Sequence, residues 1–112
     1  MACPTKSLSE YVTFVIGLIV ATKMLTGQLP NISPQTGDPE YQGESKAMLD
    51  AYRAKANVRT FDDATAQCRQ LNGGRRAMVL NYPDDGMSMW VGERSGAKYW
   101  ITKSAADPAP QK

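Results

Sequence analysis

The sequence has no histidine, only two cysteines and no large excess of charge of one sign, and each of these features argues against certain classes of site or partner. Without histidine, the chain lacks the commonest general base, the Ser-His and Cys-His catalytic pairs, and the ligand of most zinc, copper and haem sites. Two cysteines, Cys3 and Cys68, are too few to indicate a disulfide framework. We therefore expect a non-catalytic protein that holds no metal and no cofactor.

The charge balance also limits the partners. The 13 Lys and Arg residues and 11 Asp and Glu residues give a net charge of +2, which is well below the basic density of a nucleic-acid-binding protein. A chain of 112 residues has room for one small domain. The partners that we expect are other protein subunits and a lipid bilayer, with no nucleic acid and no small-molecule substrate.

One long apolar run dominates the N-terminal part of the chain. It is uncharged from Tyr11 to Thr22 and continues past Lys23 to Leu29, about 19 residues in all, close to the roughly 20 that cross a bilayer core. Lys23 is tolerable there because a lysine can hold its ammonium at the headgroups. We predict a transmembrane helix over residues 11–29, after a short tail over residues 1–10, in a single-pass membrane protein. The anchoring residues are Tyr11, Phe14, Ile16, Leu18, Ile19, Lys23 and Leu25.

This prediction separates the two ends of the run. If the helix crosses a bilayer, Cys3 and Cys68 lie in different compartments and cannot form a disulfide with each other. The acidic, lysine-free stretch from Asn31 to Glu44 favours an N-terminus on the cytoplasmic or equivalent inner side. The sequence does not indicate which membrane is involved.

Three other interpretations of the run stay open. The first is a core helix that the other copies of a homo-oligomer enclose, because the rest of this chain is too small to enclose it. The second is a cleaved signal peptide, although Glu10 and the lack of an A-x-A-like site argue against cleavage. The third is a polymerisation helix: Glu10-Tyr11 before an apolar run resembles the start of the small Flp-type pilins. Those pilins carry a glycine at the processing site, where Thr5 stands here. This resemblance implies self-assembly through packed apolar helices.

The remainder predicts a linker and a small α+β domain. Residues 30–43 hold three prolines and two glycines and are expected to be extended. Residues 45–57 are alanine-rich and favour a helix, with Asp50 and Arg53 as an i,i+3 pair. The residues expected to share one face of this helix are Met48, Ala51, Tyr52 and Lys55.

A second short helix is expected to begin at Thr60, which can cap it, with Asp63 at the capping-box position. Its apolar face would comprise Phe61, Ala64, Cys68 and Leu71, and the residues 72–74 (Asn-Gly-Gly) would end it. Three antiparallel strands follow in a meander, over residues 77–82, 87–93 and 97–103, with a hairpin connection at 94–96. The domain thus spans 44–103, and an extended polar tail covers 104–112.

Few side chains suggest a binding site. Asp62-Asp63 and Asp84-Asp85 are explained by a helix cap and a turn, since no pattern of further oxygen ligands surrounds them. Trp90 and Trp100 are expected to pair across neighbouring strands in the core or at a protein interface. The residues that we consider as possible contacts to a partner or to lipid headgroups are Arg75, Arg76, Trp90, Arg94 and Trp100.

The sequence therefore predicts a non-catalytic accessory or structural subunit that docks its helix and its small domain onto a larger membrane protein assembly. The alternative is a self-assembling structural protein, of a filament or of a membrane-containing virion, whose apolar helices pack together.

Overall fold

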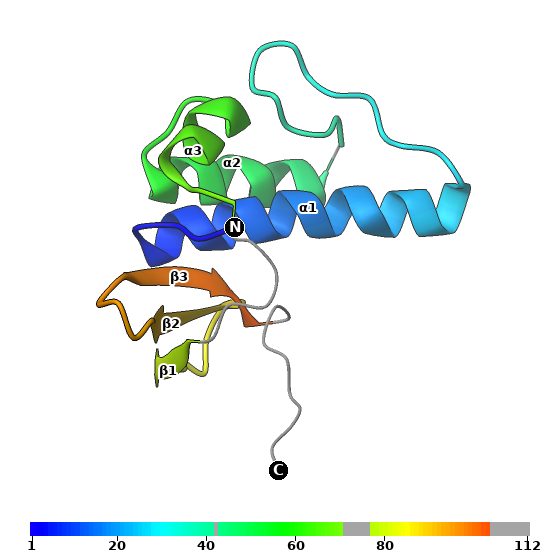
Figure 1. Ribbon diagram of the computed structural model, residues 1–112. Coiled ribbons are helices and arrows are strands. Elements are labelled where there is room, and N and C mark those ends of the chain that lie inside the picture. Colours follow the sequence, from blue (N-terminus) through cyan, green and yellow to red (C-terminus); the bar gives the residue numbers. More distant parts are fainter. Residues whose placement is uncertain (42, 71–76, 104–112) are drawn as a thin grey trace.

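The computed structural model describes residues 1–41, 43–70 and 77–103 (Figure 1). Within these ranges the chain forms three helices, α1 (Lys6–Thr26), α2 (Glu44–Ala56) and α3 (Phe61–Gln67), and three strands, β1 (Met78–Asn81), β2 (Ser88–Gly92) and β3 (Lys98–Thr102). The strands form one antiparallel sheet in the order β1-β2-β3. The predicted α+β class with two short helices and a three-stranded meander is confirmed.

Helix α1 is 21 residues long and apolar enough to cross a membrane, although its bounds differ from the predicted 11–29. It begins early because the Thr5 hydroxyl caps it, accepting from the Leu8 N–H at 3.2 Å. It ends at Thr26 because Gly27 takes a left-handed conformation (φ 78°) and its N–H donates to the Lys23 carbonyl at 2.8 Å. The ends are thus set by the caps and not by the limits of the apolar run.

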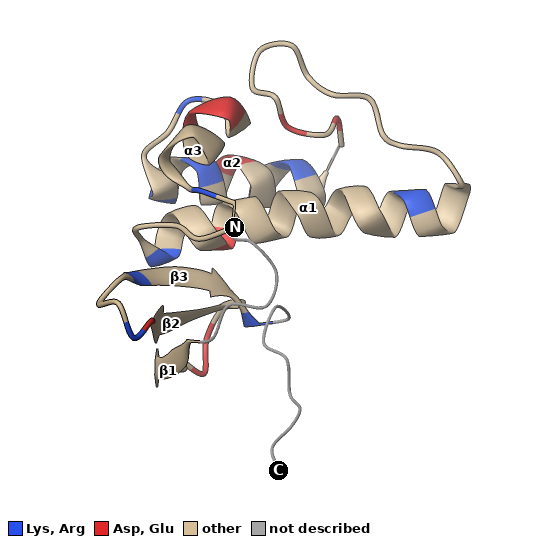
Figure 2. Ribbon diagram, viewed as in Figure 1, with Lys and Arg blue, Asp and Glu red and all other residues tan. Residues whose placement is uncertain are grey.

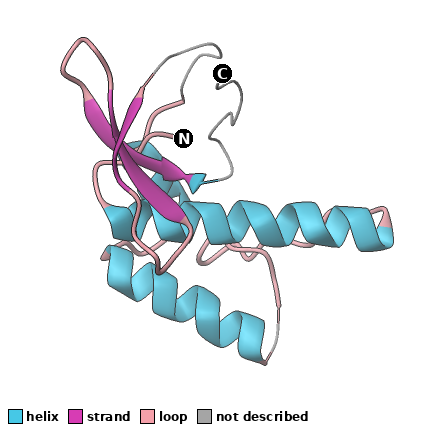
Figure 3. Ribbon diagram, turned by 90° about the horizontal axis from the view of Figure 1, so that it is seen from below, coloured by secondary structure: helices cyan, strands magenta, loops and turns pink. Residues whose placement is uncertain are grey.

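The two halves of α1 have different surroundings. The first half is enclosed, with α2 and α3 on one side and the sheet on the other (Figures 1 and 3). Its buried residues are Leu8, Ser9, Glu10, Tyr11, Val12 and Val15. The second half extends beyond the other elements. The expectation that the chain is too small to wrap this helix is therefore wrong for its first half.

A disulfide joins Cys3 to Cys68, across a sequence separation of 65 residues. The prediction that these cysteines are kept apart is wrong for this fold, because the residues that precede α1 and those that follow α3 meet on the same side of the molecule. Backbone hydrogen bonds reinforce the junction: the Ala2 N–H donates to the Arg69 carbonyl at 2.8 Å, and the Trp100 N–H donates to the Cys3 carbonyl at 2.7 Å. The N-terminal residues thereby connect α3 to β3.

This junction shortens α3. The predicted helix continued to Leu71, but α3 ends at Gln67 because Cys68 has an extended backbone (φ −104°, ψ 165°). That conformation leads the chain into the pairing of Arg69 with Ala2. The proposed end of the helix at 72–74, like Leu71 itself, lies outside the described residues.

The predicted start of α3 is confirmed, and the predicted packed face of α2 is not. The Asp63 N–H donates to the Thr60 hydroxyl at 3.0 Å, as expected for a capped helix start. The packed face of α2 differs, however, because Leu49 is buried (2% exposed) whereas Met48 is 40% exposed. The predicted face was wrong by one residue, since the alanine-rich sequence has a weak apolar periodicity.

The sheet places the two tryptophans together as predicted. Trp90 and Trp100 are cross-strand partners on β2 and β3, with ring centroids 5.3 Å apart. Strand β3 lies nearest α1 and β1 lies farthest from it (Figure 1). A bulge between Val79 and Asn81 interrupts the pairing of β1 with β2, so the simple alternation expected along this strand is broken.

Candidate docking surface

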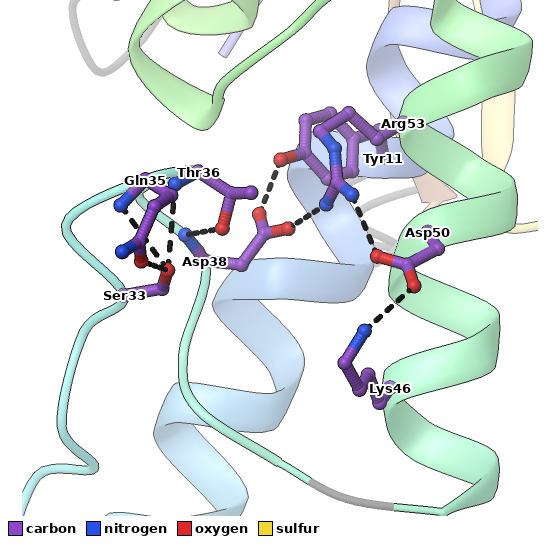
Figure 4. Close-up of polar contacts among 8 residues, drawn as sticks. All are labelled: Tyr11, Ser33, Gln35, Thr36, Asp38, Lys46, Asp50 and Arg53. Atoms are coloured by element: carbon purple, nitrogen blue, oxygen red, sulfur yellow. Dashed lines mark hydrogen bonds and ion pairs between the residues drawn. The ribbon is translucent and has the colours of Figure 1, made fainter.

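A polar network fastens the 30–43 segment to α1 and α2 (Figure 4). At its centre Asp38 is 4% exposed, and it accepts hydrogen bonds from the Tyr11 hydroxyl and the Arg53 guanidinium. Arg53 also donates to Asp50 at 2.6 Å, which confirms the predicted i,i+3 pair, and Lys46 donates to Asp50 at 3.0 Å. The segment expected to be an extended linker therefore folds back onto its own domain in this part.

The network is structural in character, and its contacts hold charged side chains of opposite sign together. The bonds from Arg53 and Lys46 hold the pKa of Asp50 below its ordinary value of 3.8. A buried carboxylate such as Asp38 needs a cationic partner and a hydrogen-bond donor, and Arg53 and Tyr11 supply these. The bonds to Asp38 thus fix the position of its chain segment against α1 and α2, whereas the bonds to Asp50 lie within α2.

Tyr41 fastens the segment to α1 farther along the helix. Its hydroxyl donates to the Leu18 carbonyl at 3.1 Å and bonds to the Thr22 hydroxyl. Leu18 and Ile19 are consequently half-buried against the core. One side of the second half of α1 is therefore partly covered by the chain itself.

The opposite side of α1 is held to the sheet by buried polar contacts. The Glu10 carboxylate, 7% exposed, accepts from the Met87 N–H at 2.7 Å, and the Ser88 hydroxyl donates to the Ser9 hydroxyl at 2.7 Å. Gly86 is needed beside Glu10, because a Cβ there would lie 2.8 Å from the Glu10 carboxylate and because its φ is +83°. These contacts fix the first half of α1 in the domain.

A third side of α1 carries an uncovered apolar stripe. Ile16, Val20 and Met24 follow one another at intervals of four residues and are 45%, 50% and 81% exposed. Beside them lies an open groove of about 380 Å³ that includes the small residues Gly17 and Ala21. We call Ile16, Val20 and Met24 the free face of α1. An exposed apolar surface of this kind, continuous along a helix, is typical of an interaction site.

Charge is scarce around the free face (Figure 2). Lys23 is the only charged residue between Tyr11 and Leu29. Its ammonium donates to the Gly27 carbonyl at 3.1 Å, so it is placed at the C-terminal end of the helix, where a cation is favoured. Leu25, at 86% exposed, adds apolar surface at the same end.

The structure divides the predicted anchor residues into three groups. Tyr11 is fully buried in the core and Phe14 packs against Tyr52 at a ring distance of 4.8 Å, so both serve the domain. Leu18 and Ile19 are half-buried, and the exposed members are Ile16, Lys23 and Leu25.

The predicted partner-contact residues that the structure describes do not join the free face. Trp90 and Trp100 are half-buried in the sheet, and Arg94 is exposed in the turn between β2 and β3, at the opposite end of the molecule from the free end of α1 (Figures 1 and 3). Arg75 and Arg76 lie outside the described residues.

Sequence reasoning missed the residues that build the domain around α1, namely Cys3, Glu10 and Asp38. The presence of two cysteines in a small domain was an available signal, but the predicted crossing overrode it. In the ranges 1–41, 43–70 and 77–103, no group of three or more Cys, Asp or Glu side chains is placed to hold a metal ion. Comparison with protein-family models, curated proteins and solved structures finds no match to this chain.

Proposed function

We propose that this protein is a non-catalytic accessory subunit that docks onto a larger membrane protein assembly through the free face of α1. The observation that carries the proposal is that half of a strongly apolar helix extends beyond the domain that encloses the other half. A monomer in water would expose this surface at a cost of roughly 25 cal/mol for each Å² of apolar area, which docking removes.

The partner that fits the free face is an apolar helix of another subunit. Gly17 and Ala21 lie beside the apolar stripe, and small residues at such positions allow a second helix backbone to approach closely inside a membrane. The uncharged surface favours a partner of the same apolar character and disfavours a charged peptide. Membrane-embedded helices present surfaces of this kind.

The folded domain constrains how α1 meets a bilayer. The Cys3–Cys68 disulfide holds the chain on both sides of α1 together, and on this ground we propose that the N-terminus and the domain lie on one side of the membrane. From Ile16 to Thr26 the helix is about 16 Å long at 1.5 Å per residue, against a hydrocarbon core of about 30 Å. We therefore propose that the free end of α1 enters the membrane region beside a partner. A single-pass crossing over residues 11–29 would require Tyr11, Val12 and Val15 to leave the core.

The disulfide also bears on the compartment. Disulfides persist in oxidising compartments and are rare in the cytosol. We accordingly propose that the N-terminus and the domain face the outer or lumenal side, in place of the inner side that the charge pattern of residues 31–44 favoured.

A charged substitution on the free face tests the proposal. We expect Val20→Asp to release the protein from the native assembly after mild detergent extraction, because a carboxylate would be buried against an apolar helix. Met48→Asp is the matched control, since Met48 is also exposed and apolar but lies on α2. Native sizing and identification of the co-purified subunits provide the measurement.

Both variants should retain the far-ultraviolet circular dichroism and the thermal midpoint of the parent. A stoichiometric set of different subunits that is lost in Val20→Asp and kept in Met48→Asp supports docking. A polymer of this chain alone, dissolved by Val20→Asp, would overturn the proposal in favour of the self-assembling alternative. Retention of all partners by Val20→Asp would rule out the free face as the contact.

A further inference from the structure

The C-terminal end of α1 carries apolar side chains that the free face does not include. Leu25 is almost fully exposed, and Leu29, just beyond the helix, is 67% exposed. Together with Met24 they form what we call the apolar tip. Helix α1 extends beyond the sheet and beyond α2 and α3 in two views (Figures 1 and 3), so a flat surface can reach the apolar tip before it meets these elements.

The apolar tip has more sides than one partner helix can cover. Successive residues of an α-helix are about 100° apart around its axis, so Met24 and Leu25 point in different directions. A partner helix along the free face contacts Met24 and leaves Leu25 exposed, because Leu25 lies about 140° from the midline of the free face. Acyl chains of a bilayer, unlike one rigid helix, surround such a tip on several sides.

The polar groups at this end of α1 are bonded within the chain. The Gly27 N–H donates to the Lys23 carbonyl at 2.8 Å, and the Thr26 hydroxyl donates to the Thr22 carbonyl at 2.8 Å. The Gln28 N–H donates to the Thr26 hydroxyl at 3.2 Å. Polar groups that enter lipid need such internal partners, because acyl chains offer none. These bonds lower the cost of transferring the end of α1 from water to lipid.

The polar side chains near the apolar tip limit the depth of its insertion. Lys23 lies about 150° from the midline between Met24 and Leu25, so it faces the opposite side of the helix. An oblique α1 that directs its two apolar side chains towards the acyl chains therefore holds the Lys23 ammonium at the level of the headgroup phosphates. Gln28 is also exposed, and its side-chain amide favours the interface over the centre of the bilayer.

We propose that the apolar tip of α1 inserts into one leaflet of a phospholipid bilayer, with Lys23 at the headgroup phosphates. This deepens the proposed docking and rests on it, since a membrane assembly brings the domain to a bilayer. The free face meets a helix of another subunit, and the apolar tip meets acyl chains. The domain stays folded during insertion, because Tyr11, Val12 and Val15 remain in the core.

Vesicle flotation of the full-length, oxidised protein tests this insertion in the absence of any partner subunit. The probes are vesicles of phosphatidylcholine alone and of phosphatidylcholine with an equal part of phosphatidylglycerol. We expect the parent to bind both. Leu25→Asp/Leu29→Asp should weaken binding at least about 100-fold, because each leucine that leaves water contributes about tenfold or more. The matched control Met48→Asp/Met78→Asp, which changes two exposed apolar residues on α2 and β1, should bind as the parent does.

A second pair of variants tests the position of the Lys23 ammonium. Lys23→Gln should weaken binding to the phosphatidylglycerol vesicles about fivefold and leave binding to phosphatidylcholine unchanged. Lys55→Gln, which removes an exposed lysine of α2, is the control. Equal losses in the two variants would overturn the placement of Lys23 at the headgroups.

The tryptophan emission of the parent tests whether the rest of the domain stays out of the bilayer. Trp90 and Trp100 lie in the sheet, so their emission should not shift when the protein binds vesicles. A shift would mean that the sheet enters lipid or that the core opens, and it would overturn insertion through the apolar tip alone.

Failure of this inference is distinguishable from failure of the docking proposal. No binding to either kind of vesicle, or equal binding by the tip variant and its control, would overturn insertion, while release of partner subunits by Val20→Asp would still support docking. Retention of all partners by Val20→Asp, with vesicle binding by the parent, would refute docking and not insertion. A homo-oligomer without lipid that Leu25→Asp/Leu29→Asp dissociates would assign the apolar tip to a second copy and overturn the inference.

Discussion

Removal of the Cys3–Cys68 disulfide should cost this domain a large part of its stability. The bond joins the residues before α1 to the residues after α3, and it encloses α1, the 30–43 segment, α2 and α3 in a single covalent loop. The double variant Cys3→Ser/Cys68→Ser opens this loop with little change in side-chain volume. The unfolded chain then gains conformational freedom that the disulfide withholds.

The expected magnitude follows from the length of the loop. For a sequence separation of 65 residues, the chain-entropy relation gives a loss of about 4 kcal/mol in the free energy of unfolding at 25 °C. Small domains have a total of roughly 5–15 kcal/mol, so the loss is comparable to the lower part of that range. With a urea dependence of about 1.3 kcal/mol per M, it corresponds to a fall of roughly 3 M in the urea midpoint.

Equilibrium urea unfolding of the full-length protein, followed by the fluorescence of Trp90 and Trp100, measures the effect. Both indoles lie in the sheet, and Trp100 is hydrogen-bonded through its backbone to Cys3, so they report on the region that the disulfide supports. The parent with reductant should match the double variant without it. Reductant should not change the double variant, which makes it the control for effects on the rest of the chain.

A midpoint that moves by less than about 0.5 M on reduction would refute the reasoning, because it would mean that the loop carries little of the stability. It would also weaken the argument that places the N-terminus and the domain on the same side of a membrane. A reduced protein that unfolds without a cooperative transition would still agree with the reasoning, since the loss would then exceed the stability available.

Two further predictions concern the charged contacts. Asp38→Ala should lower the free energy of unfolding by about 2–3 kcal/mol, because it leaves the Tyr11 hydroxyl and one side of the Arg53 guanidinium unpaired in a buried place. The control Lys46→Ala removes an exposed ion pair and should lower it by less than about 0.5 kcal/mol. Equal losses for the two variants in thermal or urea unfolding would contradict this prediction. Acid should destabilise the protein below about pH 4, because Arg53 and Lys46 hold the pKa of Asp50 below the ordinary 3.8 and Lys6 does the same for Asp85. These carboxylates contribute stability above that pH, and the contribution is lost as the pH falls through their folded pKa values. A urea midpoint that is unchanged from pH 6 to pH 2.5 would exclude the contribution.

Local features were predictable from the sequence because their causes are local. The Thr60 cap, the Asp50–Arg53 pair and the hairpin that joins Trp90 to Trp100 each involve residues a few positions apart or a recognisable turn. The packed face of α2 was not predictable to the residue, because alanines on every side give little contrast.

The environment of α1 could not be predicted in the same way. A long apolar run has the same pattern whether lipid or protein covers it, and the contacts that decide are distant in the sequence. Glu10 bonds to Met87 across 77 residues and Ser9 to Ser88 across 79, while the disulfide spans 65. Glu10 counted as the boundary of a membrane segment in the sequence, whereas in the fold it is a buried acceptor.

The enclosure of the first half of α1 has a consequence for biosynthesis. This helix is synthesised before the elements that enclose it, and the Met87 N–H and the Ser88 hydroxyl that engage Glu10 and Ser9 are made 77 and 79 residues later. Contacts of such long range form slowly, so Tyr11, Val12 and Val15 are exposed as part of one uninterrupted apolar segment throughout most of translation. In the membrane-docked protein that we propose, insertion of α1 into lipid and closure of the domain would compete for these residues, and the rate of elongation would help to decide which occurs first.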